Sequence, residues 1–129
     1  MKNIPINGKV TWFEIPTSNI SRAQPFYKGL HNWEFQKFGE EMTYWMVSVH
    51  GSHMPIGGFY EAPMQESNTP GRLIPIIYFT VEIVEESIKE AQTLGGKVKT
   101  EKTAIPTDGG YFAQVLDLDN NIIGIWVMK

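Results

Sequence analysis

The sequence WFEIPTSNISRAQPFY, residues 12–27, predicts a strand, a turn and a helix in immediate succession. Residues 12–16 are mostly aromatic or β-branched and end on a proline, a residue that strand ends tolerate. Residues 17–19 are Thr-Ser-Asn, residue types that form turns and cap helices. Apolar side chains then recur at spacings of three and four, which predicts a helix with one apolar face: Ala23, Phe26, Tyr27 and Leu30.

Side chains alternate across a strand, so the predicted first strand has two distinct faces. Phe13 and Ile15 lie on one face and are the natural partners of the helix that follows. Trp12 and Glu14 lie on the other face. A carboxylate beside a large aromatic ring on that second face favours a lined cavity over plain solvent.

Composition is that of an ordinary globular domain. The chain has 129 residues, of which 42% are hydrophobic and 19% charged. A net charge of −3 without a basic run argues against nucleic-acid binding. The absence of cysteine excludes disulfides, thiolate metal sites and cysteine nucleophiles. The first residues lack the apolar core of a signal peptide and no apolar run is long enough to span a bilayer, so we expect a cytoplasmic protein without membrane contact.

Each half of the chain repeats one order of elements, which is a strand, a helix and three strands. In the first half the helix begins near Ser21 or bends at Pro25, because proline lacks a helical amide hydrogen. Its three later strands are expected at residues 33–38, 42–49 and 54–60. In the second half we expect a strand at 73–81, a helix at 85–94 and strands at 97–105, 111–117 and 122–128. The repeat predicts one domain with modules at about 8–60 and 73–129, joined by a polar, Pro- and Gly-containing linker at about 61–72.

This order of elements resembles the vicinal oxygen chelate superfamily, which includes glyoxalase I, extradiol dioxygenases and bleomycin-resistance proteins. Three stretches carry the resemblance: residues 12–16 with Arg22-Ala23 and Phe26-Tyr27, then Gly95-Gly96-Lys97-Val98, then Asp117-Leu118-Asp119-Asn120-Asn121 ahead of Gly124-Ile125-Trp126. Leu118 stands where the superfamily usually has proline. The resemblance implies an α+β fold in which two βαβββ modules form a curved eight-stranded mixed sheet around a cleft, with helices on the outer face. It also implies a possible homodimer, and the sequence leaves open whether the cleft forms within one chain or across two.

Enzymes of this superfamily hold a divalent metal with imidazole and carboxylate ligands. The resemblance implies that three of the ligand positions correspond to Trp12, Ile76 and Gly124, and that a fourth lies within residues 56–59. None of these positions carries an imidazole or a carboxylate. The resemblance therefore implies the fold without its usual metal chemistry, and we expect neither a metal nor another cofactor.

Strand alternation brings further side chains to the face of Trp12 and Glu14. The residues predicted to contact a ligand are Trp12, Tyr44, Met46, Phe59, Ile76, Tyr78, Gly124 and Trp126. Aromatic walls with a few polar groups are typical of a small-molecule pocket. The alternative is that the same side chains pack as a filled core, and the sequence leaves both open.

Three functions are compatible with these patterns. The first is metal-independent binding of a small aromatic or apolar metabolite or drug. The second is a small-molecule lyase, isomerase or dioxygenase, with a relocated metal or with Glu14 as general base; the alternative for Glu14 is a structural carboxylate. The candidates for the relocated metal are His50 and His53, which are three residues apart in a predicted turn. The alternative interpretation is that both histidines are simply exposed to solvent. The third is a purely interacting domain with a filled core.

Overall fold

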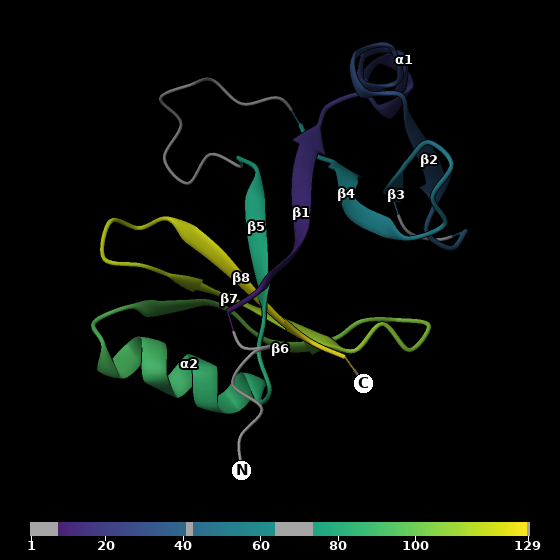
Figure 1. Cartoon of the computed structure of the whole chain (residues 1–129). Coiled ribbons are helices and arrows are strands. Elements are labelled where there is room, and N and C mark those ends of the chain that lie inside the picture. Colours follow the sequence, from purple (N-terminus) through teal and green to yellow (C-terminus); the bar gives the residue numbers. More distant parts are fainter. Residues whose placement is uncertain (1–7, 41–42, 64–73, 129) are drawn as a thin grey trace. The chain divides into compact units, whose positions relative to one another are not determined.

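The computed structural model describes residues 8–40, 43–63 and 74–128 of the chain (Figure 1). Its elements, in chain order, are β1 (Val10–Thr17), α1 (Ile20–His31), β2 (Trp33–Lys37), β3 (Tyr44–Val49), β4 (Pro55–Glu61), β5 (Ile76–Thr80), α2 (Val84–Thr93), β6 (Lys97–Ala104), β7 (Tyr111–Leu116) and β8 (Ile122–Val127). The strands form a mixed sheet in the order β2-β3-β4-β1-β5-β8-β7-β6. The predicted α+β class, the eight strands and the repeated strand-helix-three-strand order are confirmed. The predicted strand starts at residues 42 and 73, and most of the predicted linker, lie outside the described residues.

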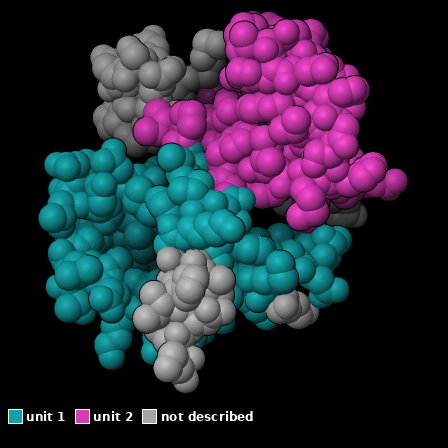
Figure 2. Space-filling model, viewed as in Figure 1, with its two compact units in different colours: residues 1–11, 76–129 teal, residues 12–75 magenta. Residues whose placement is uncertain are grey.

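The chain divides into two compact units, coloured separately in Figure 2. One unit, called here the 12–75 unit, is Trp12–Pro75, and the other, called the 76–129 unit, combines Ile76–Lys129 with Met1–Thr11. The Gly8 amide donates to the Thr80 carbonyl at 2.8 Å, and the Thr80 amide donates to the Lys9 carbonyl at 2.9 Å. Residues 8 and 9 are therefore hydrogen-bonded to β5 of the 76–129 unit.

The 12–75 unit is a four-stranded sheet with α1 against one face. β1 runs parallel to β4, whereas β2–β3 and β3–β4 are antiparallel. Three buried side chains form the core between α1 and the sheet: Ile20 of α1, Val47 of β3 and Phe59 of β4. Partly buried side chains surround them, mostly aromatic: Ile15, Tyr27, Trp33, Phe35 and Trp45. Ile15 thus packs on the helix side, as strand alternation predicts.

Helix α1 begins and ends where its cap residues allow. The Asn19 side chain accepts a hydrogen bond from the Arg22 amide at 3.2 Å, which satisfies one amide of the first turn. Asn32 closes the helix with a φ of 61°, a left-handed conformation that asparagine tolerates. The helix begins at Ile20 and accommodates Pro25 in its interior, with the ring exposed.

The 76–129 unit repeats this plan with α2. β5 runs parallel to β8, and β8, β7 and β6 follow as antiparallel neighbours. The core between α2 and the sheet is aliphatic: Val84 and Ile88 come from α2, and the other members are Val81, Ala113, Val115 and Ile125. α2 ends as predicted before Gly95-Gly96, where the Gly96 amide donates to the Ala91 carbonyl at 2.8 Å.

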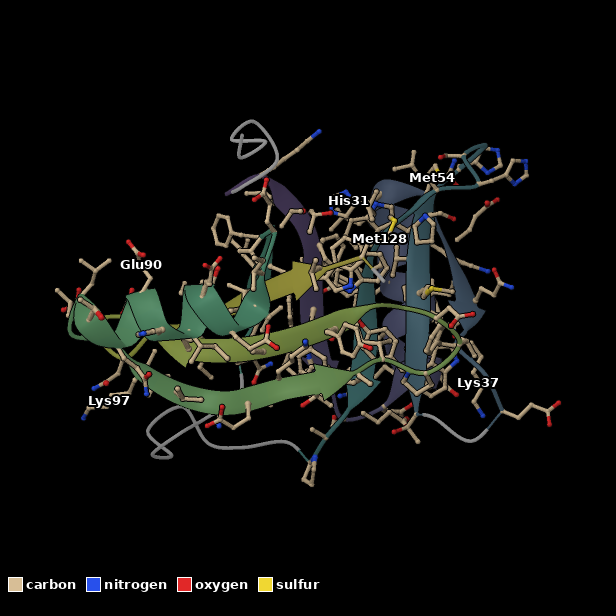
Figure 3. The ribbon with its side chains drawn as sticks, turned by 90° about the horizontal axis from the view of Figure 1, so that it is seen from below. His31, Lys37, Met54, Glu90, Lys97 and Met128 are labelled. Atoms are coloured by element: carbon tan, nitrogen blue, oxygen red, sulfur yellow. The ribbon has the colours of Figure 1, made fainter. Side chains whose placement is uncertain are left out.

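Charged side chains lie on the outside of both units. Lys37 of β2, Glu90 of α2 and Lys97 of β6 are exposed and are labelled in Figure 3. β6, which carries Lys97, Lys99, Glu101 and Lys102, is the last strand of the sheet. Neither helix that the structure describes is long and apolar enough to cross a bilayer.

Candidate functional site

The face of the 12–75 sheet opposite α1 carries the residues that the sequence singled out. Strand pairing places Glu14 opposite Gly58, and Gly58 opposite Met46 on the next strand. Two pairs further along, and so on the same face, Tyr44 lies opposite Tyr60. Directly paired residues share a face, so these side chains form one surface, called here the Glu14 face.

A directed chain of hydrogen bonds organises the Glu14 face. The Trp12 indole Nε1–H donates to the Tyr44 hydroxyl at 2.8 Å, and that hydroxyl donates to Glu14 Oε2 at 2.9 Å. Because an indole N–H is only a donor, the Tyr44 oxygen accepts from Trp12 and its single hydrogen goes to Glu14. All three side chains are half-buried, so these hydrogen bonds are partly shielded from solvent.

A glycine makes the position of Tyr44 possible. Gly58 is buried, and a Cβ added to it would overlap the ring and the hydroxyl of Tyr44. The two adjacent glycines of β4 thus both allow close approach of a ring, since Gly57 lies in the same way under the Phe13 ring on the α1 side. The register of β3–β4 also shifts beside these glycines, because Val47 pairs with Gly57 and Ser48 with Pro55, which leaves Ile56 of β4 unpaired in the β3–β4 ladder.

Tyr60 adds a second phenol to the Glu14 face. Burial raises the pKa of Tyr60, and the negative charge of Glu14 raises that pKa further. Tyr60 therefore keeps its proton throughout the neutral range. Sequence reasoning missed Tyr60. Two glycines precede Phe59 and Tyr60 in β4, and because glycines have no side chains, the sequence does not indicate which face each of the later residues occupies.

The same ambiguity explains one wrong prediction, that Phe59 shares the face of Trp12 and Glu14. Phe59 is paired with Ile15 and Trp45, and it lies in the core under α1 with 0% of its surface exposed. Its ring centroid is 4.9 Å from that of Tyr27 on the helix. Since Gly58 occupies the Glu14 face, its neighbour Phe59 must point the other way.

The 76–129 unit has a comparable surface on the side away from α2. Pairing aligns Tyr78 with Gly124 and Gln114, and Thr80 with Trp126 and Phe112. Ile76, Tyr78, Gly124 and Trp126 therefore share one face, as strand alternation predicts. We call this surface the Tyr78 face. The Tyr78 ring covers buried Gly124, where an added Cβ would overlap it.

Polar side chains hold this second tyrosine in place. Thr100 Oγ1 donates to Gln114 Oε1 at 2.9 Å, and Gln114 Nε2 donates to the Tyr78 hydroxyl at 2.8 Å. Tyr78 is only 4% exposed, so its hydroxyl needs such a partner inside the protein. Sequence reasoning missed Gln114 and Thr100, although a glutamine alternating with apolar residues in residues 111–116 is a signal for a polar group on the inner face.

Trp126 is anchored separately at the end of the Tyr78 face. Its Nε1–H donates to the Gly109 carbonyl at 2.8 Å, so the loop before β7 orients the indole. Phe112, its paired neighbour, meets the Tyr78 ring edge-on at a centroid distance of 6.3 Å. The face is thus aromatic, and hydrogen bonds fix the Tyr78 and Trp126 rings.

The residues at the superfamily's metal positions do not fit a metal ion. Trp12, Ile76 and Gly124 carry no ligand atom, and strand pairing identifies Gly58 as the counterpart of Gly124 in the first repeat. Tyrosine rings cover both glycines. Within residues 8–40, 43–63 and 74–128, no three His, Asp or Glu side chains are grouped so that they could hold a metal. His50 instead lies 3.0 Å from Glu34 at the exposed surface.

Comparison with protein-family models gave no match, and neither did comparison with curated protein sequences. Solved structures do resemble the chain. An extradiol ring-cleaving dioxygenase from B. fuscum is 12% identical, with a TM-score of 0.68 over 100% of this chain and 36% of that one. Methylmalonyl-CoA epimerase from Mycobacterium tuberculosis is 12% identical, with a TM-score of 0.64 over 100% and 93% of the two chains. A glyoxalase/bleomycin resistance protein/dioxygenase superfamily member from Vibrio splendidus is 9% identical, with a TM-score of 0.62 over 89% and 95%.

These likenesses confirm that the chain has the vicinal oxygen chelate fold, as the order of its elements predicts. At such low identity they define the fold, and the activities of those proteins do not transfer with it.

Proposed function

We propose that the protein binds a small aromatic or apolar molecule, a metabolite or a drug, without using a metal. One observation carries the proposal: at both Gly58 and Gly124 a tyrosine ring stands over a strand position where the fold's enzymes would be expected to carry a metal ligand. The result is an aromatic surface with a fixed hydroxyl in each unit. Such surfaces hold planar ligands by stacking and hydrogen bonding.

Each face offers its own proposed contacts. On the Glu14 face they are Trp12, Tyr44 and Met46, and on the Tyr78 face they are Ile76, Tyr78, Gly124 and Trp126. The chain from Trp12 through Tyr44 to Glu14 supports this proposal, because it holds the rings of the Glu14 face in defined positions before any ligand arrives. Preformed positions lower the entropic cost of binding.

A thermal-shift screen with planar aromatic compounds, run with and without EDTA, tests the proposal. We expect binders to raise the melting temperature in a concentration-dependent way, with the same rise in EDTA. Quenching of tryptophan fluorescence by the same compounds would support contact with Trp12 or Trp126. A large loss of stability on chelation, together with stoichiometric Ni, Zn, Fe or Mn in the purified protein, would contradict it.

A second candidate is a lyase or isomerase in which Glu14 acts as general base. The hydrogen bond from Tyr44 favours it, because that bond holds the carboxylate in one orientation on a half-accessible surface. Glu14→Gln would then abolish turnover while the protein stays folded, and unchanged turnover would exclude this role. Location in the cytoplasm and assembly as a homodimer remain predictions from the sequence.

A further inference from the structure

We propose that the ligand of the Tyr78 face carries a cis-amide edge, in which a ring N–H lies beside a carbonyl group, and that the Gln114 side chain recognises this edge. Planar aromatic lactams have such an edge. The inference rests on the proposed function and narrows its ligand class for the 76–129 unit. Its basis is the hydrogen bonding of the Gln114 amide, which leaves two positions unused.

The side-chain amide of Gln114 uses half of its hydrogen-bonding capacity. A primary amide has two N–H donors and two acceptor positions on its oxygen. Gln114 Oε1 accepts from Thr100 Oγ1 at 2.9 Å, and Gln114 Nε2 donates to the Tyr78 hydroxyl at 2.8 Å. Among the described residues, the Gln114 side chain makes no other hydrogen bond. One N–H and one acceptor position are therefore available to a ligand.

This result does not depend on which end of the amide is nitrogen. Both protein partners of Gln114 are hydroxyl groups, and a hydroxyl group can either donate or accept. Exchanging the amide nitrogen and oxygen would reverse the two hydrogen bonds. One N–H and one acceptor position would still remain.

The strand order places the two protein partners on opposite sides of the amide. Gln114 on β7 lies between Tyr78 of β5 and Thr100 of β6. Partners on opposite sides engage the N–H and the lone pair that point apart, so the remaining N–H and lone pair lie side by side on one edge. Gln114 is half-buried, which leaves part of its side chain accessible. Because two hydrogen bonds already hold the amide, a ligand need not order it.

The side chains around Gln114 suit a flat, uncharged molecule. Two rows of paired residues cross this part of the Tyr78 face, and none of their side chains is charged: Tyr78, Gly124, Gln114 and Thr100, then Thr80, Trp126, Phe112 and Thr103. Phe112 is half-buried and lies two residues before Gln114 on β7, so a ring stacked on Phe112 can bring its edge to the amide. The Trp126 N–H is bonded to the Gly109 carbonyl, so Trp126 offers its ring to a ligand.

The first repeat has no counterpart of this amide. Met46 lies opposite Gly58 in the β3–β4 pair, just as Gln114 lies opposite Gly124 in the β7–β8 pair. A thioether is a weak acceptor and has no hydrogen to donate. The donor–acceptor edge therefore belongs to the Tyr78 face, and methionine is a side chain that the fold accommodates at the equivalent position.

Two isomers test the inference, 4-methyl-2-quinolone and 1-methyl-2-quinolone. Both are neutral and planar, but the second carries its methyl group on the lactam nitrogen and has lost the N–H donor. Their dissociation constants are measured by calorimetry on the full chain. We expect 4-methyl-2-quinolone to bind about tenfold tighter, because the N-methyl isomer loses one hydrogen bond and leaves the Gln114 acceptor position unpaired. Equal affinity of the isomers would overturn the inference and leave the proposed function in place.

Gln114→Met removes the amide and introduces the residue of the first repeat. In this variant the preference between the isomers should disappear, mainly because 4-methyl-2-quinolone binds more weakly. An equal loss of affinity for both isomers would mean that Gln114 only supports Tyr78, and the inference would fail. Gln36→Met is the matched control, since Gln36 lies at an exposed position of β2 in the other unit. It should leave the preference intact, and loss of the preference there would point to a general effect and contradict the inference.

The Gln114 amide provides a direct measurement in the unaltered protein. In proton–nitrogen correlation spectra, saturating 4-methyl-2-quinolone should move one Gln114 Nε2–H signal downfield, because that hydrogen gains a carbonyl partner. The side-chain amide signal of Gln36 should stay in place. An unchanged Gln114 signal at saturation would contradict the inference. Failure of both isomers to bind also overturns it, and the wider thermal-shift screen then shows whether the proposed function fails as well.

Discussion

The ring of Tyr78 lies directly over Gly124, so closely that a Cβ on that glycine would overlap ring atoms. The same relationship joins Tyr44 and Gly58 in the other unit. Glycine is thus required at two equivalent strand positions for a steric reason, and the tyrosine occupies the space that a larger side chain would need.

Gly124→Ala should destabilise the protein. Tyr78 is buried and bonded to Gln114, so its ring cannot move away freely, and overpacking of this kind costs about 1–3 kcal/mol. Urea unfolding followed by fluorescence measures the change. Gly29→Ala in α1, where an added Cβ meets nothing within 4 Å, is the control and should be neutral or stabilising. Equal stability of Gly124→Ala and the unaltered protein would show that the ring relaxes without cost.

Tyr44→Phe should lower the free energy of unfolding by about 1–3 kcal/mol, because it removes a partner from both Trp12 and Glu14 in half-buried positions. Tyr44→Phe should also blue-shift or broaden the fluorescence emission of Trp12. Comparison with the spectrum of Trp12→Phe identifies the part of the emission that comes from Trp12. Tyr27→Phe is the control. Its ring packs against Trp33 in the α1 core, so it tests for a general effect of losing a phenol hydroxyl. A smaller loss for Tyr44→Phe than for the control contradicts the directed chain.

Stability should fall at alkaline pH partly through Tyr60. The pKa of Tyr60 in the folded protein is raised, so its contribution is complete below the ordinary value of about 10 and is lost as pH rises through the higher folded value. Tyr60→Phe should therefore flatten the stability curve above about pH 10. Glu14→Gln should flatten it less, since the charge of Glu14 is the smaller of the two causes. An unchanged alkaline slope in both variants would refute the shift.

Asp117 should contribute to stability at neutral pH and lose that contribution in acid. Hydrogen bonds from the Asn121 side chain, the Asn121 amide and the Asp119 amide lower the pKa of Asp117. The contribution is thus present above the ordinary value of about 3.9 and disappears as pH falls through the lowered one. Asp117→Ala should be less stable than the unaltered protein at pH 7, and this difference in stability should shrink as pH falls below the ordinary value of about 3.9. Asp119→Ala, whose exposed side chain is not the acceptor, should change little at either pH.

Several features of the candidate site follow from local pattern alone. Trp12 and Glu14 face away from the helix because strand side chains alternate, and the same rule places Tyr78, Gly124 and Trp126 together. The cap at Asn19 and the stop at Gly95-Gly96 are equally local, because they depend on side-chain and backbone groups within one turn.

The register between strands could not be derived this way. Phe59 was placed on the wrong face because Gly57 and Gly58 carry no side chains whose polarity would reveal the parity of β4. Tyr60, Gln114 and Thr100 join the site only once the strands are paired. No pattern within a single strand indicates which residue of a neighbouring strand will lie opposite.

The sequence by itself determined the order of elements and the face on which most side chains lie, because both depend on periodicities of two to four residues along the chain. Only the tertiary structure decided that Trp12, Tyr44 and Glu14 form a directed chain, and that tyrosine rings cover Gly58 and Gly124. Those relationships join residues at least 14 positions apart, and the pairing of strands, with the space that glycine leaves, brings them together.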